Sequence, residues 1–322
     1  MTDTRLLSIV IPVFNEEDNI DPLYERLIGV IDRMPERYEF EILFTDNHST
    51  DSTFDAISRL AQHDDRIRCL RFSRNFGFQR SILTGYRAAR GDAAIQIDAD
   101  LQDPPELINE FIVQWQAGYD VVYGVRRNRK EGKVLTLARR LFYWTINKLS
   151  TDDLPQDAGD FRLVDAKILD ALRDIDDYHP YLRGLIASFG FEQIGIPYDR
   201  EARERGASKF SLGKLAGLAM DGILLHSVVP LRIATGVAFL MSLFMLMGIG
   251  VYLFARLILN QDWPAGFATL AILTMVGITL NAVFLGVIGE YLGRMYQQIK
   301  KRPLTLVEQE IPNPAHRPPT SH

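Results

Sequence analysis

The sequence is poor in cysteine, nearly balanced in charge, and without two common phosphate-binding motifs. Cys69 is the only cysteine among 322 residues, which excludes an internal disulfide framework and indicates a reducing compartment. The formal net charge of −5 gives no electrostatic reason to expect nucleic-acid binding. No G-x-G-x-x-G follows the first predicted strand and no G-x-x-x-x-G-K-[ST] occurs. Dinucleotide-dependent oxidoreductases and P-loop NTPases are therefore disfavoured.

Charged side chains are missing from two long stretches in the last third of the chain. Ile233–Ala255 has none over 23 positions and Trp263–Gly289 none over 27, and each exceeds the roughly 20 residues that cross a bilayer core. Both are apolar on every face, unlike core helices of a soluble domain. We predict a two-helix transmembrane hairpin with spans at 232–259 and 263–290. The cationic residues that flank the pair are Arg232, Arg294, Lys300, Lys301 and Arg302. The positive-inside rule predicts a multi-pass protein of the inner (plasma) membrane, with the N-terminal domain and the C-terminus cytoplasmic.

Residues 1–210 alternate short apolar runs with amphipathic runs of helical period. The predicted strands lie at 6–13, 40–45, 67–72, 93–97 and 120–124. This alternation is typical of βαβ units, and it predicts an α/β, Rossmann-like sheet with helices on both faces. Basic or apolar amphipathic runs at 133–149 and 211–231 are candidates for interfacial helices at a membrane, although packing on the sheet explains the first equally well. Residues 291–322 are predicted to form a cytoplasmic tail.

The stretch Asp98-Ala99-Asp100-Leu101-Gln102-Asp103-Pro104-Pro105 carries the strongest chemical signal. It follows the apolar run at 93–97, and side chains alternate along an extended chain, so Asp98 and Asp100 project to the same side. Two carboxylates and the amide oxygen of Gln102 are hard ligands that suit Mg²⁺ or Mn²⁺ with positions left open for substrate phosphates. Ligands of open α/β sheets bind outside the carboxyl ends of the strands, where this stretch lies. An isolated D-x-D is more often a solvated turn or a helix N-cap, so this interpretation depends on the rest of the chain.

Four segments together resemble the membrane-associated glycosyltransferases of family 2, which have the GT-A fold. More narrowly, they are similar to the enzymes that load a sugar onto a polyprenyl phosphate, the dolichyl-phosphate mannose synthases and bactoprenol glucosyltransferases. The segments are Pro12–Glu16, Asp98–Pro105, Gly159–Leu163 and Arg203–Lys209. The similarity extends over roughly residues 6 to 302, and the four motifs together are far more specific than any one of them.

The resemblance implies roles for individual residues. Those implied to bind the nucleotide are Pro12, Phe14 and Glu16 around the base and ribose, and Asp46 at the base. Those implied to bind the metal ion and the donor diphosphate are Asp98, Asp100 and Gln102. Those implied to contact phosphates of donor or acceptor are Arg126, Arg203 and Lys209. Asp160 matches the aspartate that lies near the acceptor as a base, so the implied catalytic residues are Asp160, Asp98 and Asp100.

One segment departs from the pattern of the family. Relatives often carry D-D-G-S where this chain has Asp46-Asn47-His48-Ser49. The missing second carboxylate, and histidine in place of glycine, alter the base pocket or its backbone turn. UDP-glucose is favoured as the donor by similarity to bacterial members, while GDP-mannose and a UDP-amino sugar stay open.

The expected reaction is metal-dependent transfer of a sugar from a nucleotide-diphosphate sugar to a polyprenyl (undecaprenyl) phosphate at the cytoplasmic membrane face, with inversion implied by the resemblance. The expected partners are both substrates and the membrane, and a homo-oligomer stays open. A processive polysaccharide synthase is the main alternative, but it needs more spans and a Q-x-x-R-W motif, which is absent. A non-catalytic membrane scaffold would not need carboxylates at the strand ends.

Overall fold

In a computed structural model, the structure describes residues 4–35, 37–127, 158–175, 177, 180–199, 266–300 and 302–311, with short runs and single residues between 236 and 258. These residues form two units. One contains all the strands and the helices up to α7 (Leu182–Ser188), and the other contains α10 (Phe267–Ile299). The predicted interfacial helices at 133–149 and 211–231 lie outside the described residues, as do Arg203 and Lys209.

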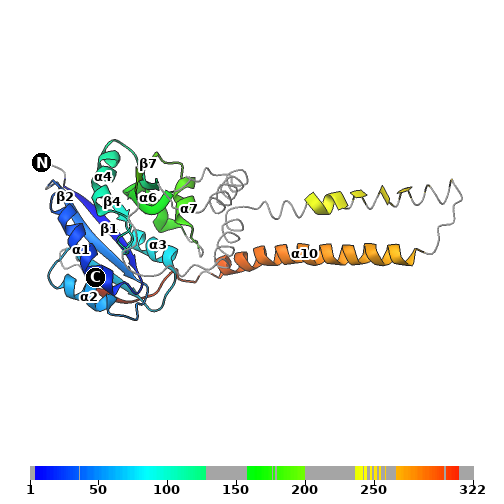
Figure 1. The fold of residues 1–322 in the computed structure, drawn as a ribbon, viewed down its shortest axis with the longest axis horizontal. Coiled ribbons are helices and arrows are strands. Elements are labelled where there is room, and N and C mark those ends of the chain that lie inside the picture. The colour runs from blue at the N-terminus through cyan, green and yellow to red at the C-terminus, as the bar shows by residue number, and fades with distance from the viewer. Residues whose placement is uncertain are drawn as a thin grey trace, which may run out of the picture. The chain divides into compact units, whose positions relative to one another are not determined.

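The first unit is built on an eight-stranded mixed sheet (Figure 1). The strand order is β7-β5-β6-β4-β1-β2-β3-β8. The strands are β1 (Arg5–Val13), β2 (Tyr38–Asp46), β3 (Ile67–Phe72), β4 (Ala93–Gln96), β5 (Val121–Arg126), β6 (Ala158–Asp165), β7 (Gln193–Tyr198) and β8 (Val307–Ile311). The other helices of this unit are α1 (Glu17–Ile31), α2 (Thr53–Ala61), α3 (Phe78–Ala88), η1 (Pro105–Leu107), α4 (Ile108–Gln116) and α6 (Ala166–Asp174).

Helices cover both faces of the sheet, which confirms the predicted α/β architecture. Along α1, apolar side chains recur at helical spacing, so Ile20, Leu23 and Leu27 are all buried on the side that faces the sheet. They share one apolar cluster with α2 and α4, while α3, α6 and α7 pack with a second cluster. Strand β1 is buried on both sides and supplies both clusters, Ile9 to the first and Val10 to the second. The central parallel strands therefore lie in the middle of a three-layer core.

Strand β6 runs antiparallel to both of its neighbours. It brings a motif that is distant in sequence to the end of the sheet where β4 stops. It runs antiparallel to β4, with Gln96 opposite Arg162. Continuing that register by two residues sets Asp160, near the start of β6, opposite Asp98, just after the end of β4. An antiparallel neighbour begins where its partner ends. The segment Gly159–Leu163, which the sequence linked to the acceptor, thus lies at the same edge as the D-x-D stretch.

The last described segment returns to the sheet. Strand β8 pairs antiparallel with β3, with Cys69 opposite Ile311, and the backbone N–H of Ser73 donates to the carbonyl of Leu306 at 2.9 Å. The buried Arg68 also donates to Glu310 on this strand at 2.9 Å. Part of the predicted tail at 291–322 is therefore a structural strand of the N-terminal unit.

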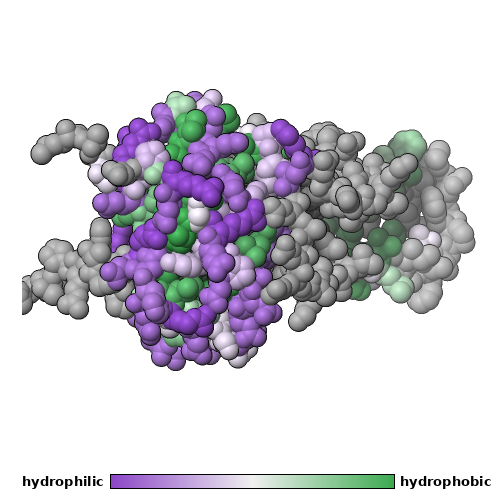
Figure 2. All heavy atoms as spheres, turned by 60° about the vertical axis from the view of Figure 1, so that its left-hand side comes forward, coloured by the Kyte–Doolittle hydropathy of each residue, from purple (hydrophilic) through white to green (hydrophobic). Residues whose placement is uncertain are grey.

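Helix α10 is long and apolar, and it is the orange helix in Figure 1. Within it, Leu273–Gly293 is long and hydrophobic enough to cross a membrane, with a mean hydropathy of 1.7 and no residue of that window buried. It begins and ends later than the predicted span at 263–290. Most of the predicted span at 232–259 lies outside the described residues, although residues 236–241 are helical. By contrast, the face of the strand-bearing unit in Figure 2 is mainly hydrophilic.

Candidate functional site

Four central strands deliver polar side chains to one edge of the sheet. The parallel strands β1, β2 and β4 end there, with Val13 paired to Asp46 across β1 and β2. Strand β6 begins there because it runs the opposite way. Helices and loops follow directly, so this edge carries Phe14 and Glu16 after β1, and Asp98 and Asp100 after β4.

A pocket of about 340 Å³ opens at this edge. It brings together three of the four residues predicted to bind the nucleotide, Asp46 being the exception, with two predicted metal ligands. The residues that line it are Pro12, Val13, Phe14, Glu16, Asn47, Asn75, Gly77, Phe78, Asp98, Ala99 and Asp100. A pocket of about 370 Å³ at the opposite ends of the strands, around Tyr38 and Arg66, has none of the strand-end carboxylates. The first pocket is therefore the candidate active site.

Asp98 is the most strongly perturbed acid of the site. Burial, together with the negative charges of Asp103, Asp160 and Asp100, raises the pKa of Asp98 to about 7. A hydrogen bond of 2.8 Å from Gln96 Nε2 to Asp98 Oδ1 opposes this rise without overcoming it. Several carboxylates thus converge at one point, which costs energy unless a positive charge lies among them.

The donor set at Asp98 and Asp100 fits a divalent cation. Within the described ranges, no group of three or more His, Cys, Asp or Glu side chains is arranged to hold a metal. Mg²⁺ usually takes only one or two protein carboxylates and completes its shell with substrate phosphates and water, so two carboxylates suffice. A cation there would also relieve the repulsion that raises the pKa of Asp98. Gln102 does not line the pocket, but its backbone N–H donates to Asp100 Oδ1 at 3.2 Å. Its predicted role as a ligand stays a prediction.

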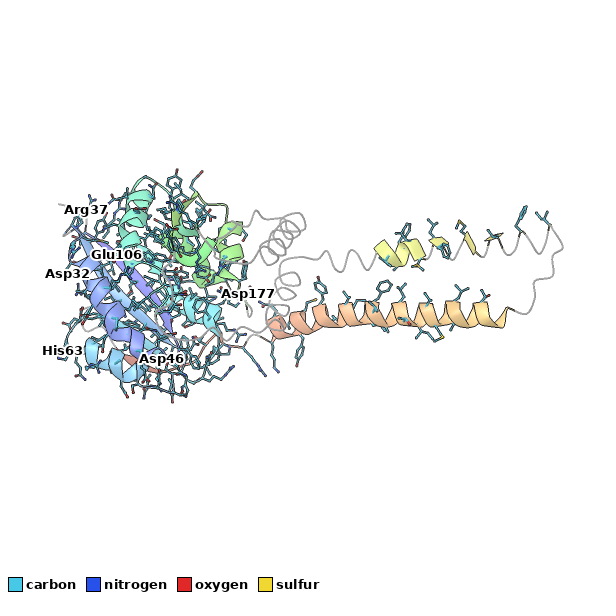
Figure 3. The ribbon with its side chains drawn as sticks, in the orientation of Figure 1. Asp32, Arg37, Asp46, His63, Glu106 and Asp177 are labelled. Carbon is cyan, nitrogen blue, oxygen red and sulfur yellow. The ribbon has the colours of Figure 1, made fainter. Side chains whose placement is uncertain are left out.

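Asp46, labelled in Figure 3, is the last residue of β2, is fully buried and does not line the pocket. Its Oδ1 accepts hydrogen bonds from the backbone N–H and the hydroxyl of Ser49, at 2.9 and 2.6 Å. Its Oδ2 lies 3.7 Å from Arg71 Nε and has no hydrogen-bond partner among the described residues. Asp46 therefore ties the turn after β2 and keeps one buried oxygen with unused acceptor capacity.

His48 occupies the position where relatives often have glycine. Its φ of 61° lies in the left-handed region, which glycine adopts most readily. Its Nδ1 lies 2.9 Å from the carbonyl oxygen of Phe72 and 3.5 Å from Glu308 Oε2 on β8. The histidine thus takes a backbone conformation that glycine would adopt readily, and its side chain contacts Phe72 and Glu308 and does not line the pocket.

Arg126 is held beside the carboxylate cluster by two neighbours. Its Nη2 lies 3.7 Å from Asp103 Oδ2, and its Nε donates to the hydroxyl of Tyr198 at 3.3 Å. That hydroxyl donates in turn to Asp103 Oδ1. Burial would lower the pKa of Arg126, but Asp103 and Tyr198 raise it. The ring of Tyr198 lies against Gly124, where an added Cβ would come within 2.6 Å of it.

Asp160 is buried, with 9% of its surface exposed, and forms an ion pair. Arg183 of α7 donates from Nε to Oδ1 at 2.9 Å and from Nη2 to Oδ2 at 2.7 Å. Burial alone would raise the pKa of Asp160, but the hydrogen bonds and charge of Arg183, with the charge of Arg162, hold it below its usual range. Asp160 is therefore a stable anion near the pocket.

Reasoning from the sequence missed several residues of this site. It assigned no role to Asp103, Tyr198, Arg162 or Arg183. Asp103 was part of the quoted D-A-D-L-Q-D-P-P stretch, and its complete burial opposite Arg126 is visible only in three dimensions. No local signal marks Arg183, because its importance comes from a partner 23 residues earlier in the chain.

The sequence profile named Glycosyl transferase family 2 matches residues 8–173, which is the part of the chain that carries the D-x-D stretch and Asp160. The chain belongs to this family. It is therefore a glycosyltransferase, and its mixed sheet with helices on both faces is a GT-A-like fold.

Members of glycosyltransferase family 2 that resemble this one span nearly its whole length. An uncharacterised glycosyltransferase of Synechocystis is 40% identical over 94% of this chain and 94% of its own. A prophage-derived bactoprenol glucosyl transferase of Shigella flexneri is 34% identical over 94% of this chain and 97% of its own. Among solved structures, glucosyl-3-phosphoglycerate synthase of Mycobacterium tuberculosis, in complex with Mn²⁺, UDP-glucose and phosphoglyceric acid, matches with 18% identity and a TM-score of 0.47, over 68% of this chain and 78% of that one. A likeness of that degree says nothing of what this chain binds.

Proposed function

We propose that this glycosyltransferase moves glucose from UDP-glucose to a polyprenyl phosphate, undecaprenyl phosphate in a bacterial membrane, with the help of Mg²⁺ or Mn²⁺. The observation that carries the proposal is the pocket in which Phe14 and Glu16 lie beside Asp98 and Asp100. Full-length similarity to bactoprenol glucosyl transferases, at 34% identity, supports the acceptor and the sugar.

The donor would lie with its nucleoside against the end of β1. Pro12, Phe14 and Glu16 offer an aromatic face and a carboxylate to the base and ribose. Phe14 is exposed even though it is a large apolar side chain, as expected of a residue that stacks on a ligand. The buried Oδ2 of Asp46, which has no hydrogen-bond partner among the described residues, would accept a hydrogen bond from an N–H of the base.

The donor diphosphate would lie toward Asp98 and Asp100. These carboxylates would hold a divalent cation, which would supply positive charge to the diphosphate that leaves when the bond from the anomeric carbon to its oxygen breaks. Gln102 is the further ligand implied by the family resemblance. Arg126, held beside the cluster by Asp103 and Tyr198, would contact phosphate oxygens, as would Arg203 and Lys209.

The acceptor chemistry demands little of a base. A phosphate monoester has its second pKa near 6, so at neutral pH the polyprenyl phosphate is largely dianionic and already nucleophilic. The harder task is to bring that dianion to a negatively charged donor, which requires positive charge at the site. Asp160, beside Asp98, would orient the acceptor or take its last proton.

We further propose that the chain crosses the membrane twice, through the predicted spans at 232–259 and 263–290. Strand β8 follows α10 and pairs with β3 in the N-terminal unit, so the segments before and after the apolar region lie on the same side of any membrane. If α10 crosses the bilayer, the chain must therefore cross it once more before α10. The helical residues 236–241 and the 23-residue uncharged run support a span there.

The function is tested with membranes that contain the full chain, undecaprenyl phosphate and radiolabelled sugar donors. We expect label from UDP-glucose in the organic phase after lipid extraction, with little from GDP-mannose or UDP-N-acetylglucosamine. Transfer should stop with EDTA and return with Mg²⁺ or Mn²⁺. The double variant Asp98→Asn/Asp100→Asn should lose transfer, and Glu106→Gln, on the surface beside Arg26, should keep it.

Two outcomes would overturn the proposal. Label in a water-insoluble polymer that is not extracted as lipid would identify a processive synthase. Full activity of the Asp98→Asn/Asp100→Asn variant would exclude a role for the metal at this site. Label from another donor, with UDP-glucose inactive, would replace the sugar and keep the reaction class.

A further inference from the structure

The ion pair of Asp160 and Arg183 has the geometry of a fixed recognition element. The planar guanidinium donates two parallel hydrogen bonds, of 2.9 and 2.7 Å, to the two oxygens of one carboxylate. Bidentate pairs of this kind fix the rotamers of both side chains and are among the strongest hydrogen-bonded contacts in proteins. This ion pair therefore joins helix α7 to the start of strand β6, at the end of the sheet that carries the candidate active site.

Further groups hold Asp160 from the elements around it. Gln79 of α3 also donates a hydrogen bond to Asp160, and Arg162 on the same strand adds a second positive charge. Arg162 is itself buried and donates to the carbonyl of Gly159 at 3.0 Å. The buried hydroxyl of Tyr86 lies near enough to interact electrostatically with both Asp160 and Arg162. Among the described residues, the groups that act on the Asp160 carboxylate are thus mainly hydrogen-bond donors and positive charges.

This environment does not suit a general base. A base needs a lone pair directed at the substrate and a pKa close to the working pH. Both oxygens of Asp160 already accept hydrogen bonds from Arg183, and the pKa of Asp160 lies below its usual range. A dianionic phosphate acceptor has no proton to lose. The family resemblance suggested a base, and the geometry favours another task.

Exposure distinguishes the two partners. The Asp160 side chain is 10% exposed, whereas that of Arg183 is 27% exposed. Arg183 therefore reaches further toward solvent than the carboxylate beneath it. The register of β4 and β6, continued by two residues, sets Asp160 opposite Asp98, and the charge of Asp160 helps to raise the pKa of Asp98. The pair therefore lies on the Asp98 side of the site, although neither residue lines the pocket.

We propose that Arg183 contacts the phosphate of the acceptor and that Asp160 is a positioning residue that holds its guanidinium in place. The inference rests on the proposed function and deepens it, because it names the group that brings positive charge to the acceptor anion. In this role Asp160 orients Arg183 and does not accept a proton. Arginine suits this task because its fork can bind a carboxylate on one edge and still present positive charge to a phosphate.

The test compares Arg183→Lys, Arg183→Met and Asp160→Asn in the full-length protein, with UDP-glucose and undecaprenyl phosphate as substrates. We expect Arg183→Lys to raise the KM for undecaprenyl phosphate about tenfold, since one charge remains without the fork, and Arg183→Met to raise it further. Asp160→Asn keeps the shape and an acceptor oxygen, so kcat should fall by no more than about tenfold. The affinity for UDP in the presence of Mg²⁺ should stay within about twofold in each variant.

Two controls accompany these variants. Arg59→Met removes another arginine that donates to both oxygens of an aspartate, Asp21, on an exposed surface. It should change neither the KM for undecaprenyl phosphate nor the KM for UDP-glucose. The second control is UDP binding, which shows that a variant is folded. If Arg183→Met fails to bind UDP, the comparison of Arg183→Lys with Asp160→Asn still tests the proposed roles of the two residues.

The inference is overturned if Asp160→Asn abolishes kcat while the KM for undecaprenyl phosphate of both Arg183 variants stays at the wild-type value, because that pattern belongs to a general base. A separate result would remove the proposed function itself: wild-type protein that binds UDP yet neither transfers glucose to undecaprenyl phosphate nor binds nanodiscs containing that lipid.

Discussion

Asp98, one of the proposed metal ligands, lowers the free energy of unfolding of the metal-free protein at neutral pH. Its pKa in the folded protein is about 7, raised mainly by burial and then by Asp103, Asp160 and Asp100. In an unfolded chain it would titrate near 4. Between these values the folded state holds more protons than the unfolded state, so this residue makes the free energy of unfolding fall as the pH rises from about 4 to 7.

We therefore expect Asp98→Asn to stabilise the protein without metal. At pH 8 the cost of ionising Asp98 is fully present, and removing it should raise the free energy of unfolding by on the order of 2 kcal/mol. At pH 5 the gain should be small. Thermal unfolding of EDTA-treated protein in detergent at the two pH values measures this. Added Mg²⁺ should stabilise the wild type and not the variant, and a variant less stable than wild type at pH 8 would contradict the argument.

Gly124 offers a second test at the scale of one atom. A Cβ there would lie 2.6 Å from the ring of Tyr198, whose hydroxyl joins Asp103 to Arg126. We expect Gly124→Ala to displace the ring, loosen Arg126 and lower kcat/KM for the nucleotide sugar about tenfold, or ~1.4 kcal/mol. The matched control is Gly29→Ala in α1, where a Cβ meets nothing within 4 Å, and which should leave kcat/KM unchanged.

The residues of the site were predictable only where the chemistry is local. Asp98 and Asp100 follow a buried strand, so the sequence was enough to place both at its carboxyl end, where they line the pocket. The predicted alternation of side chains does not explain their placement, because β4 ends at Gln96 and Asp100 lies in a turn. Arg183 and Tyr198 owe their roles to partners far along the chain. Neither has a neighbouring motif, and only the packing of α7 and β7 on the sheet shows what they contact.

Strand β8 extends the argument from residues to elements. It lies at the edge of the sheet and most of its side chains are exposed, so its sequence Val307–Ile311 lacks the apolar alternation that marks a strand. Its main partners lie more than 200 residues earlier, as in the contact of Arg68 with Glu310. The sequence accordingly suggested a tail. The family profile, which ends at residue 173, does not include it either.

Arg68 should matter far more than its partner on β8. It is buried and lies 3.4 Å from the buried Glu41 and 2.9 Å from the half-exposed Glu310. We expect Arg68→Met to leave Glu41 without its counter-ion and to lower the free energy of unfolding by about 3 kcal/mol. Glu310→Gln keeps the hydrogen bond on a more exposed side chain and should cost less than about 1 kcal/mol.

Urea unfolding followed by far-UV circular dichroism compares these two variants with wild type. Equal midpoint shifts would show that the charge of Glu41 is not the decisive term. If Glu310→Gln lowered the free energy of unfolding more than Arg68→Met does, the pairing of β8 with β3 would contribute more to stability than the contact of Arg68 with Glu41.

At the scale of the whole molecule, the sheet constrains the membrane topology. Strands β3 and β8 pair with each other, and the apolar region, including α10, lies between them in the sequence. A chain whose two flanks meet in one sheet crosses a bilayer an even number of times. The uncharged runs predicted two crossings from composition, and the pairing of β8 gives an independent reason for an even number.

Cysteine labelling tests this topology, because the native Cys69 is fully buried and should react only after denaturation. We expect Gln261→Cys, between the two uncharged runs, to react with a membrane-impermeant maleimide in intact bacterial spheroplasts. Gln309→Cys, on exposed β8, should react only after lysis, because the proposed hairpin would return the chain to the cytoplasmic side. Labelling of both positions, or of Gln309→Cys alone, before lysis would exclude the cytoplasmic arrangement. If position 261 is protected until lysis, the chain does not cross the membrane between β7 and α10. A single crossing by α10 would then place β8 and β3 on opposite sides of the membrane. Because these strands pair with each other, α10 would have to lie on the membrane surface.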